Sequence, residues 1–113
     1  MIRVAFDCDD TIAKIIKQED SYTQVPDYDL IQIVRWFINN GDEVYIWSAG
    51  GTDYATNWAR KLGIYDQVKI IPKVELGETH PQIDIAFDDV ESNLGKVTVR
   101  VKRELGMGPK RSI

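Results

Sequence analysis

The stretch Val4-Ala5-Phe6-Asp7-Cys8-Asp9-Asp10-Thr11-Ile12 decides how this chain of 113 residues is interpreted. Residues 2–6 form a short apolar run around one arginine, a length that is typical of a buried strand. Three carboxylates and a threonine follow directly. Acidic side chains packed together repel one another, and hard divalent cations such as Mg²⁺ bind carboxylate oxygens. The stretch therefore predicts a metal site at the carboxyl end of the first strand, with one carboxylate free for chemistry.

Length and composition indicate one ordinary globular domain. The chain has 43% hydrophobic and 28% charged residues, which is a typical globular balance. No apolar run approaches the roughly 20 residues that span a bilayer, so we expect no membrane partner. The apolar stretch after Met1 is too short for a signal peptide. The single cysteine, Cys8, excludes an internal disulfide and fits a cytoplasmic protein. We expect a monomer or a small homo-oligomer.

The charges are divided unevenly along the chain. Of the 14 basic and 18 acidic residues, five basic and one acidic lie from Arg100 onward, which leaves 9 and 17 in the first 99 residues. An acidic body argues against broad nucleic-acid binding. The basic tail, residues 104–113, has two open interpretations: a solvated chain end, or a contact to the phosphates of a substrate.

Strand and helix patterns alternate along the rest of the sequence. A polar stretch over residues 13–26 predicts a small hairpin over the end of the first strand. Further strands are predicted at residues 44–47, 68–71, 83–87 and 97–101. Two helices lie between them, the first capped by Asp27 or Asp29 and the second by Thr52 or Asp53. This order predicts an α/β fold with a mostly parallel five-stranded sheet.

Apolar residues at helical spacing predict the buried faces of the two helices. These residues are Leu30, Ile33, Val34 and Phe37 in the first helix, and Ala55, Trp58, Ala59 and Leu62 in the second. The three tryptophans, Trp36, Trp47 and Trp58, fall on or next to core faces, so we expect them to serve in packing rather than in stacking on nucleic-acid bases. His80 is expected to be a surface residue in a loop.

Polar clusters follow four of the predicted strands. They are residues 7–11, residues 48–51, Lys73, and the pair Asp88-Asp89. The carboxyl ends of parallel strands share one edge of a sheet, so the fold would bring the four clusters together.

In this order the motifs resemble those of the haloacid dehalogenase superfamily of phosphohydrolases, over roughly residues 2–101. Residues 7–11 fit the first motif, Asp-x-Asp-x-Thr after a strand. Ser48 fits the second motif, Lys73 the third, with Lys69 as an alternative, and Asp88-Asp89 the fourth. The chain departs from the family at Asp10, where the family most often has glycine. The departure matters because a side chain at this position restricts the backbone.

The resemblance implies a fold and an activity: a Rossmann-like three-layer sandwich, and a Mg²⁺-dependent phosphatase that works through an aspartyl-phosphate. Asp7 would be the nucleophile, and Asp9 would protonate the leaving oxygen and then deprotonate the attacking water. Asp7, Asp9 through its backbone carbonyl, Asp88 and Asp89 would surround the metal.

The resemblance also assigns the residues that bind the phosphoryl group. Ser48 would bind it together with the backbone N–H groups that follow, including that of Ala49, and Lys73 would act as a point charge. Thr11 would shape the turn or contact the same phosphate.

The spacing of the motifs leaves no room for an inserted cap domain. About 35 residues separate Thr11 from Ser48, and about 24 separate Ser48 from Lys73. We therefore expect residues 1–103 to form one catalytic domain with an open site. The phosphorylated substrate stays open among a nucleic-acid 3′ end, a phosphoprotein, and a small sugar or nucleotide phosphate.

Two other classes of protein remain to be distinguished. A signalling receiver domain also forms an aspartyl-phosphate, but it needs an aspartate at the end of its third strand, where this chain has Ile70-Ile71-Pro72-Lys73. A catalytically inactive module could bind phosphate or metal with the same residues. A cysteine phosphatase is disfavoured because Lys14 stands where its anion-binding loop needs arginine, so Cys8 is expected to be a buried, inert thiol.

Overall fold

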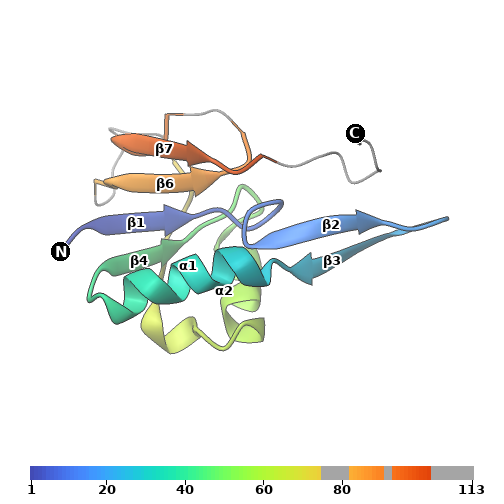
Figure 1. The fold of residues 1–113 in the computed structure, drawn as a ribbon, viewed down its shortest axis with the longest axis horizontal. Helices are drawn as coiled ribbons and strands as arrows, with labels where there is room; N and C mark the ends of the chain where they lie inside the picture. The colour runs from blue at the N-terminus through green and yellow to red at the C-terminus, as the bar shows by residue number, and fades with distance from the viewer. Residues whose placement is uncertain (75–81, 91–92, 103–113) are drawn as a thin grey trace.

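A five-stranded parallel sheet organises the protein (Figure 1). The computed structural model describes residues 1–74, 82–90 and 93–102. The sheet has the order β5-β4-β1-β6-β7, and each neighbouring pair is parallel. Its strands are β1 (Arg3–Phe6), β4 (Glu43–Ile46), β5 (Lys69–Ile70), β6 (Ile85–Asp88) and β7 (Val97–Arg100). The predicted α/β class and parallel sheet are confirmed. His80 and the tail lie outside the described residues.

The order of the strands determines where a ligand can bind. Counted along the chain, the sheet strands lie in the order 3-2-1-4-5, which is the order of a Rossmann-like sheet. Successive strands are added on one side of β1 and then on the other, so the direction of winding reverses between β1 and β6. Ligands of such sheets bind outside the carboxyl ends of the strands at this reversal. Phe6 pairs with both Ile46 and Phe87, so the three central strands end level with one another.

Both helices pack on the same face of the sheet. They are α1 (Tyr28–Asn39) and α2 (Thr52–Lys61). Right-handed crossovers that run in one direction across a sheet place successive helices on one face. The core on this face contains inward side chains of β1 and β4 together with Leu30 and Val34 of α1 and Ala55 of α2.

Two details of the predicted helices differ from the structure. Asp27 caps α1 as expected, because its side chain accepts a hydrogen bond from the backbone N–H of Leu30 at 3.2 Å. The residue before α2 is Gly51, which has a φ of 104° and no side-chain cap, so the prediction of Thr52 or Asp53 as the cap was wrong. Ile31 takes the buried position predicted for Ile33, which is 40% exposed, because α1 turns a slightly different stripe toward the sheet.

The opposite face of the sheet is covered by connecting segments. Ala5, Tyr45, Trp47 and Ala86 pack there against Ile83 and Leu94. The described residues thus place helices on one face of the sheet and irregular chain on the other.

The three tryptophans, predicted to lie on or next to core faces, are buried to different extents. Trp47 and Trp58 are buried, as expected, whereas Trp36 is 59% exposed and packs edge-on against Phe37 beside the core. Trp36 lies on α1 just outside the buried stripe, where the helix faces solvent.

The predicted hairpin is present and extends beyond the carboxyl edge of the sheet (Figure 1). It consists of β2 (Ala13–Lys17) and β3 (Tyr22–Pro26), which are antiparallel. A short 3-10 helix, η1 (Tyr65–Gln67), was not predicted. Across the described part of the chain, no helix has the length and apolar character needed to cross a membrane.

Candidate functional site

Three charged side chains from distant parts of the chain meet at the reversal between β1 and β6. Asp7 directly follows β1, and its backbone N–H donates to the carbonyl of Phe87 at 3.0 Å, which ties the ends of β1 and β6 together. The Nζ of Lys73 lies 3.1 Å from Oδ1 of Asp7 and 2.8 Å from Oδ2 of Asp88. The side chains of Asp7 and Asp88 are almost fully buried. The lysine therefore pairs with both carboxylates inside the protein.

A third carboxylate, that of Asp89, completes an acidic cluster. Asp7, Asp88 and Asp89 can each offer one oxygen, and these oxygens lie within 4.8 Å of one another. Carboxylate oxygens at this spacing are the donors that Mg²⁺ prefers. Lys73 contributes one positive charge to three carboxylates, so the ionised cluster keeps a net negative charge that a divalent cation would neutralise. The residues present therefore fit a hard cation.

The pKa shifts in the cluster are those expected of carboxylates that are only partly neutralised by positive charge. Burial, and next the charge of Asp88, raise the pKa of Asp7 to about 7, although Lys73 opposes the shift. Burial and the hydrogen bond with Asp88 also raise the pKa of Asp89. Burial alone would lower the pKa of Lys73, but its hydrogen bond to Asp88 and the charge of Asp7 raise it. The lysine is therefore held in its charged form.

The turn after Asp7 needs one residue in the left-handed region. Asp10 has a φ of 58°, and its Oδ1 accepts a long hydrogen bond of 3.4 Å from the backbone N–H of Ile15. Aspartate enters this region more readily than most residues with a side chain. The backbone N–H of the buried Thr11 donates to the carbonyl of Cys8 at 3.1 Å. The turn thus forms with aspartate in the position where the resemblance leads one to expect glycine.

Cys8 is buried, as predicted. Burial, followed by the charges of Asp7 and Asp9, raises the pKa of its thiol to about 12. A thiol that stays protonated is a poor nucleophile, so the geometry gives Cys8 no part in the chemistry.

The loop after β4 is shaped by Ser48. Its buried Oγ accepts a hydrogen bond from the backbone N–H of Gly50 at 2.9 Å, and its carbonyl accepts one from Gly51 at 3.0 Å. Ala49, between them, is exposed. The loop begins directly after the strand that neighbours β1, so it adjoins the acidic cluster at the same edge of the sheet.

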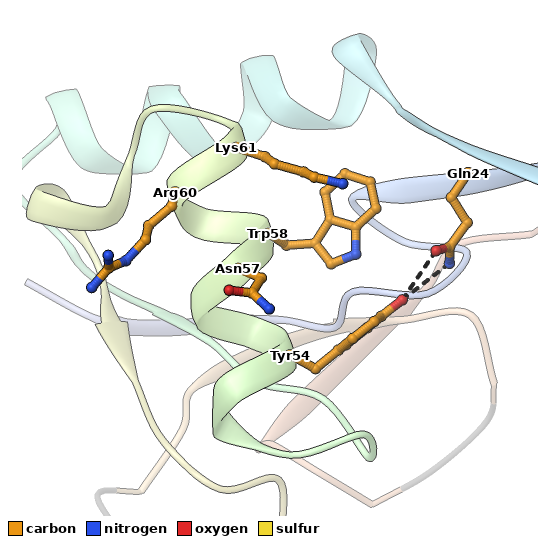
Figure 2. A pocket seen from close by; sticks show the side chains of 6 residues that line it. All are labelled: Gln24, Tyr54, Asn57, Trp58, Arg60 and Lys61. Atoms are coloured by element: carbon orange, nitrogen blue, oxygen red, sulfur yellow. Dashed lines mark hydrogen bonds between the residues drawn. The ribbon is translucent and has the colours of Figure 1, made fainter.

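The carboxylate of Asp9 is not part of the acidic cluster, and it bonds two residues that the sequence analysis did not identify. Its Oδ1 accepts hydrogen bonds from the hydroxyl of Tyr54 at 2.5 Å and from Nε2 of Gln24 at 2.8 Å. Tyr54 belongs to α2 and Gln24 to β3 (Figure 2). Only the position of Tyr54, in the first turn of the helix after the Ser48 loop, could have drawn attention to it. Nothing in the sequence singles out Gln24.

The structure distinguishes between the two candidate lysines. Lys69 pairs with Glu43 through Nζ and Oε2 at 3.0 Å. Glu43 opens β4, so this ion pair lies toward the amino end of the sheet. Lys73 is therefore the lysine at the site.

The sequence matches no protein-family model, no curated protein and no solved structure. The family resemblance consequently rests on the motif residues themselves, and the activity it implies has to be argued from their geometry.

Proposed function

We propose that the protein is a Mg²⁺-dependent phosphatase of the haloacid dehalogenase type, which hydrolyses a phosphomonoester through an aspartyl-phosphate on Asp7. The observation that carries this proposal is the ion pair of Lys73 with both Asp7 and Asp88. It joins three of the four motifs at the point where the sheet reverses its winding. A cluster of carboxylates with one half-buried lysine suits a phosphoryl group, which needs positive charge around its oxygens.

The chemistry divides into two displacements. An oxygen of Asp7 attacks phosphorus, and the leaving oxygen departs with a proton from Asp9. Water then attacks the aspartyl-phosphate and gives a proton to Asp9, so that inorganic phosphate leaves and Asp7 is restored. The ammonium of Lys73, the hydroxyl of Ser48 and the backbone N–H group of Ala49 stabilise the charge on the phosphoryl oxygens.

The metal would be held by Asp7, Asp88 and Asp89, with the backbone carbonyl of Asp9 as a further ligand. Bound Mg²⁺ would neutralise the carboxylates and polarise the phosphoryl oxygens. Because burial raises the pKa of Asp7 to about 7 without a metal, a nearby cation would favour the ionised form that acts as the nucleophile.

The order of the strands disfavours the receiver-domain alternative. Receiver domains have the flavodoxin-like order 2-1-3-4-5, whereas this sheet has the order 3-2-1-4-5. The third strand, β5, is followed by Lys73 rather than by an aspartate. An inactive binding module would share the same residues, and only turnover separates it from an enzyme. We also propose that the whole domain has the three-layer architecture of the family.

The test is hydrolysis of a generic aryl phosphate with and without Mg²⁺. The wild-type protein is compared with Asp7→Asn, and with Asp66→Asn as a matched control in η1, away from the site. Activity that requires Mg²⁺ and Asp7 but not Asp66 would establish the phosphatase. Activity that survives in Asp7→Asn would refute the nucleophile. Metal binding without turnover of any phosphomonoester would favour the inactive module.

A further inference from the structure

A groove of about 510 Å³ adjoins Asp9 and is not used by the chemistry described so far. It is lined by Gln24, Tyr54, Asn57, Trp58, Arg60 and Lys61. Its volume falls within the range of about 300–1,000 Å³ that is usual for small-molecule sites. Figure 2 shows that it lies along α2, with Gln24 of β3 facing Tyr54 and Trp58.

The position of the groove relates it to the leaving group of the substrate. Tyr54 and Gln24 line the groove, and both donate hydrogen bonds to Oδ1 of Asp9. In the proposed reaction Asp9 protonates the leaving oxygen. The remainder of the leaving group therefore lies next to Asp9, where the groove begins.

The charge of the groove is opposite to that of the protein. The chain has a net charge of −4, yet none of the six lining residues is acidic and two are basic. Neither Arg60 nor Lys61 belongs to any of the ion pairs among the described residues. The ammonium of Lys61 lies 4.9 Å from the ring centre of Trp58. An anion that reaches this part of the groove meets a cation that forms no ion pair with a carboxylate in the described part of the chain.

The remaining lining residues suit a nucleoside. Gln24 and Asn57 carry amides, which both donate and accept hydrogen bonds and can read the edge of a base. Tyr54 offers a half-buried aromatic ring on which a base could stack. Lys61 lies seven positions after Tyr54, which is about 10 Å along a helix. The groove can therefore accommodate a base and sugar between Asp9 and the ammonium of Lys61.

We propose that this groove binds the leaving group of the substrate and selects a nucleoside that carries a second phosphate. This inference rests on the proposed phosphatase function, because it assigns the leaving group to the side of Asp9. The same chemistry occurs in a free nucleoside bisphosphate and at the phosphorylated end of a nucleic-acid strand.

The experiment compares kcat/KM for an aryl phosphate, a nucleoside monophosphate, a nucleoside 3′,5′-bisphosphate, a hexose bisphosphate and a short single-stranded oligonucleotide with a terminal phosphate. The second phosphate is expected to raise kcat/KM of the nucleoside by about tenfold at low salt, as a charge-assisted contact does. Whichever of the oligonucleotide and the free nucleoside bisphosphate has the higher kcat/KM identifies the natural source of the second phosphate. Preference for the hexose bisphosphate would overturn the assignment of a nucleoside.

Variants at Lys61 separate binding from helix stability. Lys61 lies in the last turn of α2, where a basic residue also stabilises the helix end. Lys61→Ala is expected to lower the ratio of kcat/KM for the bisphosphate to that for the monophosphate by about tenfold. Lys96→Ala removes the same charge at the amino edge of the sheet, where it pairs with Asp84, and is expected to leave the ratio unchanged. An unchanged ratio in Lys61→Ala would overturn the inference while aryl phosphatase activity stands.

A binding measurement tests the groove even if the protein hydrolyses none of these phosphates. Calorimetric titration of the nucleoside bisphosphate into the Asp7→Asn protein, with and without Lys61→Ala, does not depend on turnover. Affinity that falls about tenfold with Lys61→Ala would support the groove even if the phosphatase function fails. Absence of binding would overturn it.

Discussion

Replacing Asp7 by asparagine is expected to stabilise the metal-free protein at neutral and higher pH. Burial raises the pKa of Asp7 from 3.8 to about 7, and each pKa unit corresponds to about 1.4 kcal/mol. Ionisation of the buried carboxyl therefore lowers the free energy of unfolding by about 4 kcal/mol at full effect. Because part of this shift comes from the neighbouring charges of Asp88 and Asp89 rather than from burial, we expect Asp7→Asn to recover about 2–4 kcal/mol.

The effect has a defined pH window. A carboxyl whose pKa is higher in the folded state holds its proton more tightly there, so stability falls as pH rises from about 4 to about 7 and is level above that. The gain from Asp7→Asn is thus expected to grow between about pH 4 and pH 7 and to stay level at higher pH. Urea unfolding in EDTA, followed by the fluorescence of the buried Trp47 and Trp58, measures it.

Added Mg²⁺ is expected to reverse the order of stability. The cation binds the folded wild-type cluster and stabilises it by mass action, whereas Asp7→Asn has lost one ligand. The exposed Asp66→Asn serves as the control in both conditions. The reasoning would be refuted by an Asp7→Asn protein that is no more stable than the wild type at pH 8 in EDTA, or by a gain that does not change with pH.

Three further predictions concern single residues. Because Asp10 has a φ of 58°, Asp10→Gly is expected to change the free energy of unfolding by less than about 1 kcal/mol, whereas Asp10→Val should cost about 1–2 kcal/mol in urea unfolding. Hydrogen bonds from Tyr45 and Lys69 lower the pKa of Glu43 to about 2, so the stability that this group contributes is lost as pH falls from about 4.5 toward 2. Glu43→Gln should show a shallower loss in acid unfolding, and an equally steep loss would contradict this ion-pair role. Cys8 is buried with a pKa of about 12, so iodoacetamide should modify it only after unfolding, and mass spectrometry would detect modification of the native protein if this is wrong.

Much of the fold follows from local sequence patterns. The apolar runs end in polar clusters, and the bounds of the five sheet strands agree with the prediction to within two residues. Asp27 follows Pro26 and caps α1 as expected. Errors occurred where burial depends on how an element turns toward its neighbours. Ile33 was assigned to the buried face by helical spacing, but the rotation of α1 leaves it exposed and buries Ile31 in its place.

The candidate site could be predicted only as a list of residues. The sequence by itself determined which side chains follow the strands, because hydrophobic periodicity and turn chemistry are local properties. Since the strands are parallel, their carboxyl ends then bring these side chains to one edge of the sheet. Only the tertiary structure decided that Lys73 rather than Lys69 pairs with Asp7 and Asp88. It also decided that Tyr54 and Gln24 hold Asp9. These contacts join residues that are 15 to 66 positions apart in the sequence. The distance in space between such residues depends on how the whole chain packs.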